Sequence, residues 1–274
     1  MSHQPRKRFG QNFLQDSGVI ADILAALNPS SGEKIVEIGP GLGALTLPLL
    51  AAVNHLDAIE IDRDLAAALQ EELAPRLTLH LCDVLNFDFH ALGSDLRIVG
   101  NLPYNISTPL LFHLATFADD LRDIHVMLQK EIVERMVAAP GDSNFSRLSV
   151  MIQYRFAVDL LIEVPPTAFR PAPKVDSAVV RLVPLRPLPH ETANEKVFAQ
   201  VVAAAFSQRR KTLRNSLSSV LNAADLESIG IAPGARAQEL SVAQFVAIAD
   251  RKSTRLNLQS PMYLVCRLLL EKKK

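Results

Sequence analysis

The tetrapeptide Asn101-Leu-Pro-Tyr104 places a side-chain amide, a proline and an aromatic ring directly after a short apolar run. Pro103 has no N–H and favours an extended conformation in the preceding residue, so nearby carbonyl groups can project outward as acceptors. Asn101 adds a side-chain carbonyl, and Tyr104 adds a flat face on which a base can stack. Two acceptors that grip the hydrogens of a heteroaromatic amine would turn its lone pair toward an electrophile. The pattern indicates a site for an exocyclic amine; the alternative is a rigid Asn-x-Pro turn.

A second group of residues could hold a nucleoside-containing cofactor. The glycine turn Gly39–Gly43 lies between a predicted strand and an apolar helix, an order typical of the cofactor-binding unit of a doubly wound fold. Glu60 follows about 20 residues later, where an acid can accept hydrogen bonds from both hydroxyls of a ribose. Asp62 lies on the same face and is the alternative.

Two further acids bear on this interpretation. Asp83 follows the next predicted strand and could accept a hydrogen bond from the amino group of an adenine ring. For Glu60 and Asp62 the alternative role is an ordinary helix N-cap, for which Asp64 is the better candidate. His80 and Cys82 lie two residues apart, but two ligands do not make a metal site, and no metal is expected.

These side chains must be positioned by a sheet, because each follows a short apolar run. Open α/β sheets place their ligands at the carboxyl ends of their strands, so the runs should be neighbouring strands of one sheet. The predicted strands are Lys34–Ile38, His55–Ile61, Leu77–Cys82, Arg97–Gly100 and Asp123–Gln129.

The chain of 274 residues, of which 49% are hydrophobic, can bury one large core and a smaller one. Prolines 184, 187 and 189 mark a linker, which predicts a catalytic domain over residues 1–185 and a second domain over 190–250. The second domain is expected to be all-helical, with helices over 195–206, 212–221, 223–229 and 242–249. Residues 251–274 are left unassigned, and an artefactual tail is one interpretation.

Composition limits the remaining function classes. The two cysteines, Cys82 and Cys266, form no C-x-x-C pair, which excludes a disulfide scaffold or a spaced zinc site. The basic start contains neither a signal peptide nor a membrane span, so a cytoplasmic protein is expected. The formal net charge is zero, so nucleic-acid binding must come from local patches. Two exist, Arg6-Lys7-Arg8 and Arg209-Arg210-Lys211 with Arg214, and the alternative for each is a solvated face.

In order and spacing, Phe9 to Leu14, Glu37 to Gly43, Asn101 to Thr108, Phe169 to Val180 and Phe206 to Asn215 resemble the ribosomal RNA small-subunit adenine dimethyltransferases. The resemblance implies a Rossmann-like, seven-stranded α/β methyltransferase sheet whose last strands form an antiparallel hairpin. It implies S-adenosylmethionine as the methyl donor. The implied substrate is two adjacent adenosines near the 3′ end of small-subunit rRNA, in a partly assembled 30S-type subunit, and a monomer is expected.

The resemblance also assigns site residues. The donor site falls on Asn12, Leu14, Gly39, Glu60, Asp83 and Asn101, with Gly41 in the same glycine turn. The target adenine falls on Asn101, Leu102, Pro103 and Tyr104, and Phe169 is implied to stack on the base from the other side. The helical domain, with its cluster Arg209, Arg210, Lys211 and Arg214, is implied to bind RNA.

Three other functions remain open. A related family methylates large-subunit rRNA and shares the glycine turn and an Asn-x-Pro-Tyr motif, but Leu102 and the second basic cluster argue against it. A non-catalytic RNA-binding assembly factor would keep the fold, although the intact set of Glu60, Asp83, Asn101 and Tyr104 favours catalysis. An NAD-dependent dehydrogenase would explain the glycine turn and Glu60, but leaves the tetrapeptide without a role.

Overall fold

The computed structural model describes residues 11–258, and the chain folds as two compact units. Within the described residues, the first comprises residues 11–137 together with Arg155–Leu185; the second comprises Ala138–Tyr154 and residues 186–258. The basic segment Arg6–Arg8 and residues 259–274 lie outside the described residues. None of the described helices is long and apolar enough to cross a membrane.

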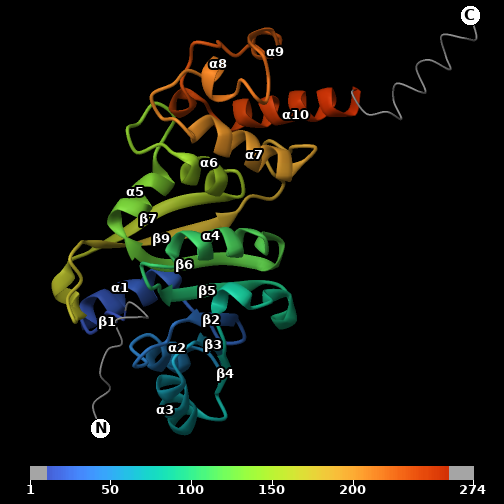
Figure 1. Cartoon of the computed structure of the whole chain (residues 1–274). Helices are drawn as coiled ribbons and strands as arrows, with labels where there is room; N and C mark the ends of the chain where they lie inside the picture. Colours follow the sequence, from blue (N-terminus) through green and yellow to red (C-terminus); the bar gives the residue numbers. More distant parts are fainter. Residues whose placement is uncertain (1–10, 259–274) are drawn as a thin grey trace, which may run out of the picture. The chain divides into compact units, whose positions relative to one another are not determined.

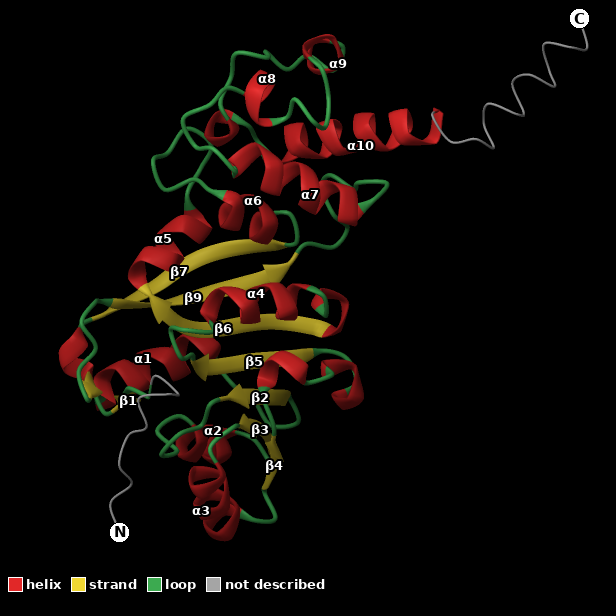
Figure 2. Ribbon diagram, in the orientation of Figure 1, coloured by secondary structure: helices red, strands yellow, loops and turns green. Residues whose placement is uncertain are grey.

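The first unit is built on one seven-stranded sheet (Figures 1 and 2). Its order is β4-β3-β2-β5-β6-β9-β7. Strands β2 to β6 are parallel, and β9 runs antiparallel to both β6 and β7. This confirms the expected seven-stranded sheet with an antiparallel pair at the end. The strands are β2 (Lys34–Ile38), β3 (Leu56–Glu60), β4 (Leu77–Leu81), β5 (Leu96–Asn101), β6 (Leu121–Gln129), β7 (Phe156–Val164) and β9 (Ser177–Pro184).

The helices of this unit alternate with the parallel strands, as the strand, turn and helix pattern predicts. They are α1 (Ser17–Leu27), α2 (Thr46–Ala52), α3 (Arg63–Leu73), α4 (Ser107–Ala115) and α5 (Lys130–Val137). A separate two-stranded ribbon pairs β1 (Phe13–Leu14) with β8 (Phe169–Arg170) in antiparallel register. This ribbon fixes the segment that precedes α1 against the excursion between β7 and β9.

A buried arginine stabilises the strand that carries the tetrapeptide. Arg97 of β5 donates through Nε to Asp123 of β6 at 3.0 Å and through Nη1 to Glu33 at 2.7 Å. Its Nη2 donates to the carbonyl of Leu27 at the end of α1. Because a buried charge without partners is costly, this network holds β5 beside β6 and thereby fixes where Asn101 emerges.

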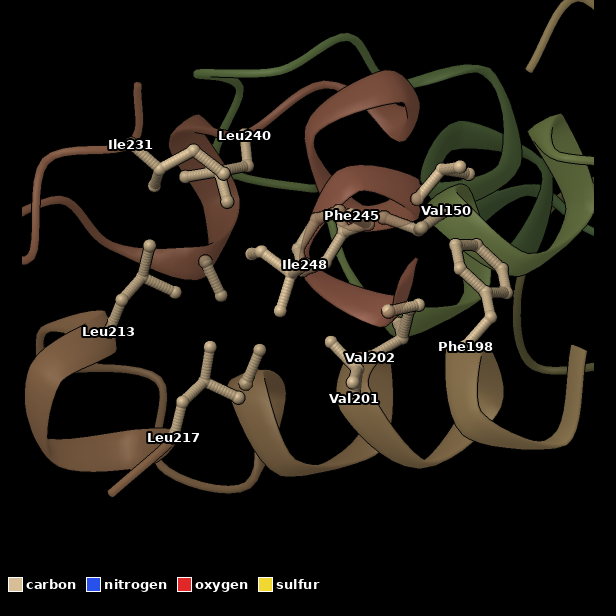
Figure 3. Packing of buried hydrophobic residues seen from close by; sticks show 14 of the residues in the cluster. Val150, Phe198, Val201, Val202, Leu213, Leu217, Ile231, Leu240, Phe245 and Ile248 are labelled. Carbon is tan, nitrogen blue, oxygen red and sulfur yellow. The ribbon is translucent and has the colours of Figure 1, made fainter. Parts of the chain in front are cut away.

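The second unit is helical (Figure 3). Its elements are α6 (Arg147–Gln153), α7 (Glu195–Phe206), α8 (Leu213–Ser216), α9 (Ala223–Glu227) and α10 (Val242–Leu258). The core between α7, α8 and α10 contains Phe198, Val202, Leu213 and Ile248. Burial of large side chains of this kind contributes about 1.5–3 kcal/mol each, which is the main term that holds so small a unit together.

The structure corrects three predictions about domains and helices. Residues 138–154 were expected in the first domain, but Phe145, Val150 and Tyr154 are buried in the core of the second unit. The helix predicted over 212–221 is only Leu213–Ser216, because serines beyond it bond to nearby carbonyls, as Ser218 does to Asn215. Helix α10 continues to Leu258, where Arg251 and Arg255 form ion pairs with Asp225 of α9.

Candidate functional site

A cavity of about 300 Å³ lies at the carboxyl edge of the sheet. Four parallel strands, β2, β3, β4 and β5, end at its wall, which is the location expected for ligands of an open α/β sheet. Among the predicted site residues, the tetrapeptide lines it together with Asn12, Gly39, Gly41, Glu60 and Asp83. The structure therefore brings most of the predicted donor residues and the predicted amine site into one cavity.

The glycine turn forms one wall of the cavity, and at two of its positions the structure requires glycine. Gly39 and Gly41 have φ values of 68° and 58°, a region that side chains rarely adopt. A Cβ atom at Gly41 would also lie only 3.2 Å from the ring of Phe13, which packs over the turn. The turn thus needs glycine for its backbone and for the approach of the N-terminal segment.

Glu60 is fixed in place by backbone groups. Its Oε1 accepts hydrogen bonds from the N–H groups of Ile61 and Asp62, each at 2.9 Å, and its Oε2 accepts one from Gly41 at 3.3 Å. Burial raises the pKa of this carboxyl; the three backbone bonds oppose that rise and the nearby Asp62 adds to it. Glu60 therefore joins the ends of β2 and β3, and Oε2, with one partner, has the capacity to accept a ligand hydroxyl.

Asp62, the alternative to Glu60, is used structurally. It is the N-cap of α3 and accepts from the N–H of Asp64 at 3.1 Å, so the prediction that Asp64 is the cap was wrong. Its other oxygen accepts from Nε2 of Gln11 at 3.1 Å. The choice between the two acids follows from these contacts, because Glu60 lines the cavity whereas Asp62 is buried by its own helix and by Gln11.

Asp83 marks the end of β4. Its Oδ1 accepts from the N–H of Leu85 at 3.0 Å and caps a short 3-10 helix, Val84–Asn86. Its Oδ2 has no partner within residues 11–258, so one oxygen can accept a hydrogen bond from a ligand amino group. Ile61, which is 45% exposed, also lines the cavity and offers it an apolar side chain.

A further carboxyl near the cavity was missed as a site residue, although the sequence shows it two positions before the glycine turn. Glu37 is buried at the end of β2 and accepts from Oγ1 of Thr46 at 2.7 Å. Burial raises its pKa to about 7; the hydrogen bond from Thr46 opposes the rise and the charge of Glu60 adds to it. The sequence did not predict a fully buried acid, because the alternation of polar and apolar residues along the strand is the same for a buried and for a half-exposed carboxyl.

Glu37 predicts a pH-dependent stability. Its pKa in the folded chain is about 7 against 4.5 for the ordinary carboxyl, so the unfolded chain ionises first and stability falls as pH rises between these values. The full cost above pH 7 is about 3 kcal/mol, at about 1.4 kcal/mol per pKa unit. Glu37→Gln keeps an acceptor for Thr46, and should be more stable than the parent by up to that amount at pH 8 and equal to it near pH 4.

Urea unfolding of both proteins at pH 4 and pH 8 measures this difference. Glu72→Gln, at an exposed position on α3, is the control and should leave the pH dependence unchanged. Equal stabilities of Glu37→Gln and the parent at pH 8 would contradict the elevated pKa.

Local hydrogen bonds determine which backbone acceptors of the tetrapeptide are occupied. The N–H of Leu102 donates to the carbonyl of Met127 on β6 at 3.1 Å. The carbonyl of Pro103 accepts from Ile106 N and Ser107 Oγ, both at 3.2 Å, so it serves the start of α4. Within the described residues the carbonyl of Leu102 has no partner. Leu102 also lines the cavity, so its carbonyl is one backbone acceptor that a ligand there could use.

Asn101 is oriented by the segment that covers the cavity. Its Nδ2 donates to the carbonyl of Asn12 at 2.9 Å, which assigns the amide orientation. Its Oδ1 has no partner in the part of the chain that the structure describes, and is left as an acceptor on the cavity side. Asn101 and Leu102 thus offer two acceptors beside the cavity, although the sequence did not say which carbonyl would be the second.

Tyr104 also lines the cavity, and its hydroxyl is engaged. The phenol oxygen lies 2.6 Å from Oγ of Ser177 at the start of β9. Burial raises the pKa of Tyr104, and the hydrogen bond with Ser177 opposes the rise. The ring is therefore a neutral, tethered platform at neutral pH.

The N-terminal segment covers one side of the cavity, which explains why Asn12 belongs to the site. Gln11, Asn12 and Phe13 line the cavity, and the N–H of Gln15 donates to the carbonyl of Ala168 at 2.8 Å. Gln11 and Phe13 were missed because the sequence of a polar N-terminal segment does not show which part of the sheet the segment will pack against. Leu14, a predicted donor residue, is 5% exposed in the core and lines a small recess beside the cavity, not the cavity itself.

Phe169 does not occupy the predicted stacking position. It pairs with Leu14 in the β1–β8 ribbon, is 5% exposed, and is absent from the cavity lining. The ring lies in the same core as Val164 and Ala168. Burying a large apolar ring in the core is more favourable than leaving it exposed on a turn. In this conformation Phe169 therefore supports the covering segment and presents no face to a base.

The basic cluster lies in the second unit on a turn. Arg209, Arg210, Lys211 and Arg214 are exposed, but only Arg214 belongs to a helix, α8. The four-residue spacing of Arg210 and Arg214 predicts that they share one helical face. Because Arg210 lies on the turn, that prediction is wrong. Arg209 donates to the carbonyl of Ser143, and this contact fixes the start of the turn.

Comparison with known proteins identifies relatives that match most of this chain, including the residues that line the cavity. The family model of ribosomal RNA adenine dimethylase matches residues 2–254. A ribosomal RNA small subunit methyltransferase A of Thiobacillus denitrificans is 59% identical over 254 residues, which covers 92% of this chain and 100% of the relative. The protein of the same name from Burkholderia multivorans is 52% identical and covers 94% of this chain and 97% of the relative.

Solved structures agree with these matches. A dimethyladenosine transferase from Plasmodium falciparum superposes with a TM-score of 0.75 at 26% identity and covers 86% of this chain and 95% of the other. A 23S rRNA methyltransferase, ErmE, gives a TM-score of 0.69, also at 26% identity, over 88% of this chain and 100% of the other. Residues 255–274 lie outside the family match, as expected from the sequence for most of that tail.

Proposed function

Because this chain belongs to the ribosomal RNA adenine dimethylase family, we propose that it dimethylates the exocyclic amines of two adjacent adenosines near the 3′ end of small-subunit rRNA. The family makes it an enzyme that uses S-adenosylmethionine. Identities of 52–59% to small-subunit methyltransferases, against 26% to ErmE, favour the small subunit over the large-subunit alternative. The single observation that carries the site assignment is that acceptors and acids from four strand ends meet in one cavity.

The residues present fit the donor. A cavity of about 300 Å³ is within the range of small-molecule sites. Glu60 would accept the ribose hydroxyls and Asp83 the adenine amino group, with Ile61 against the ring. Gly39 and Gly41 allow a ligand to approach the backbone closely. Asn12 closes the site, because its carbonyl accepts a hydrogen bond from the side chain of Asn101.

Asn101 and Leu102 would bind the target amine. The Asn101 Oδ1 and the Leu102 carbonyl each accept one amine hydrogen and direct the nitrogen lone pair away from the ring plane. Tyr104 would stack on the base. Bound S-adenosylmethionine supplies an electrophilic methyl group: the nitrogen–carbon bond forms, the carbon–sulfur bond breaks, and the amine loses a proton. That proton becomes acidic only after transfer, so the site needs no strong general base.

The second unit is proposed to hold rRNA phosphates through its basic turn. Replacing Arg210, Lys211 and Arg214 by Ala should weaken RNA binding and lower the slope of log affinity against log salt by about 0.7–0.9 for each phosphate that the variant no longer neutralises. Arg209 is kept because it donates to Ser143. Filter binding at several salt concentrations measures the slope.

The control is Lys196→Ala, which removes an exposed cation on α7 outside the cluster and should keep the parental slope. S-adenosylmethionine affinity should be the same in all three proteins. A triple variant with the parental slope would show that the cluster is a solvated face and does not hold RNA phosphates.

Labelled S-adenosylmethionine tests the function as a whole. We expect label on two adjacent adenosines of small-subunit rRNA, with partly assembled 30S-type subunits a better substrate than free rRNA, and a monomeric, cytoplasmic enzyme. Label on large-subunit rRNA would favour the related family. Binding to small subunits without any label would favour the non-catalytic assembly factor.

A further inference from the structure

The side chain of Tyr104 is tied to a residue outside the cavity. Its hydroxyl and Oγ of Ser177 are 2.6 Å apart, and Ser177 is completely buried. Ser177 is not among the residues that line the cavity. Among the described residues, the contact that links Ser177 to the cavity lining is its hydrogen bond with the hydroxyl of Tyr104.

Ser177 is a rigid anchor because both neighbouring strands hold it. It is the first residue of β9, where its backbone is in register with Gln129 of β6 on one side and with Val164 of β7 on the other. Tyr104 belongs to the turn that follows β5, and β5 is separated from β9 by β6. The hydrogen bond thus ties the turn to a strand with which β5 does not pair.

The hydrogen bonds of Leu102 and Pro103 act on the backbone of the turn. Leu102 donates to Met127, and Pro103 accepts from Ser107. Neither fixes the direction of the Tyr104 ring, whose side-chain torsions are free to change around a fixed backbone. Among the described residues, Ser177 is the hydrogen-bond partner of the phenol.

We propose that Ser177 is a positioning residue for methyl transfer, which holds the ring of Tyr104 in the orientation that stacks on the target base. The proposal rests on the proposed function of the cavity. A stacked base must present its amine to the methyl group within a narrow range of distance and angle, and small misplacements of reacting groups slow such reactions. A tether on the ring therefore contributes to the chemical step even though its anchor touches no substrate.

The proposal changes the expectation for Tyr104→Phe. From the residues alone, Tyr104→Phe is expected to be much milder than Tyr104→Ala, because the stacking face remains. With Ser177 as the anchor, loss of either hydroxyl removes the same bond, and the loss of one neutral hydrogen bond should slow single-turnover methylation by about 3–10-fold. The double variant should be no slower than the slower single variant, because the bond can be lost only once.

The experiment measures single-turnover methylation of small-subunit rRNA by Ser177→Ala, Tyr104→Phe and the double variant, at saturating S-adenosylmethionine. RNA and donor affinities should stay at the parental values, which separates a lost position from a lost fold. Ser177→Thr keeps the hydroxyl and should restore the rate to within about 2-fold of the parent, a difference well under 1 kcal/mol. Tyr154→Phe, which removes a buried hydroxyl near Glu195 in the second unit, is the control and should keep the parental rate.

Tyrosine NMR provides a readout that does not depend on activity. The chain has three tyrosines, so ¹³Cζ labelling gives three signals, and Tyr104→Phe and Tyr154→Phe assign two of them. Ser177→Ala should shift the Tyr104 signal and leave the Tyr154 signal in place. If the parent does not methylate rRNA, the proposed function fails, and the NMR arm still decides whether the tether exists.

Each of three results would overturn the positioning role. The first is an unchanged Tyr104 signal in Ser177→Ala. The second is a double variant whose rate loss equals the product of the two single losses, because independent effects show that the two hydroxyls do not act through one bond. The third is a parental rate in both single variants.

Discussion

Asn101→Ala is expected to slow single-turnover methylation by about 10²–10³-fold at saturating S-adenosylmethionine, the size found when one preorganised polar group is removed from an active site. The Oδ1 atom would accept a hydrogen bond from an amine that gains positive charge as it attacks. That bond is worth more in the transition state than in the ground state, so its loss appears in the chemical step. Rapid-quench measurement of methylated rRNA gives this rate directly.

The controls separate chemistry from binding. RNA affinity should barely change, because phosphate contacts elsewhere carry it. Donor affinity should fall somewhat, since Nδ2 of Asn101 also holds the carbonyl of Asn12 over the cavity. Asn54→Ala, at an exposed position outside the cavity, should behave as the parent. A rate within a few-fold of the parent for Asn101→Ala would reduce the tetrapeptide to a turn.

Glu60→Ala is expected to weaken S-adenosylmethionine binding by about 100-fold or more. A carboxylate bonded to ribose hydroxyls makes charge-assisted hydrogen bonds, each of which contributes about 1.5–3 kcal/mol. Calorimetric titration with S-adenosylmethionine measures the dissociation constant. RNA affinity should be retained, so the variant separates the two ligands.

Folding must be checked in the same experiment, because Glu60 also accepts from three backbone N–H groups, one of them Gly41. Thermal unfolding monitors this loss. Asp64→Ala removes the acid in the first turn of α3 and is the charge-matched control, which should bind the donor as the parent does. An unchanged dissociation constant in folded Glu60→Ala would remove Glu60 from the ribose site.

The residues of the cavity that the sequence could predict are those at strand ends. A short apolar run stopped by glycine, an acid or proline predicts both the strand and the edge at which it ends, which is why Gly39, Glu60, Asp83 and Asn101 meet as expected. Their partners were not predictable in this way. That Asn101 would donate to Asn12, 89 residues away, is a property of the packed chain.

Two of the failures share one physical cause, which is competition for burial. Phe169 was expected to face a base, but its ring is buried in the core with Leu14. Residues 138–154 lie between two elements of the first unit in the sequence, yet Phe145 and Tyr154 complete the core of the second. Local patterns show that a side chain is apolar, but they do not show which core will receive it.

The assignment of the cavity to the methyl donor is tested most directly by a crystal structure of the protein with S-adenosylhomocysteine, the product of the donor. We expect the ligand in the cavity at the carboxyl edge, with ribose hydroxyls within hydrogen-bond distance of Glu60 and the adenine amino group at Oδ2 of Asp83. The space beside Asn101, Leu102 and Tyr104 should remain open for the base. A ligand bound elsewhere, or one whose ribose lies away from Glu60, would contradict the assignment.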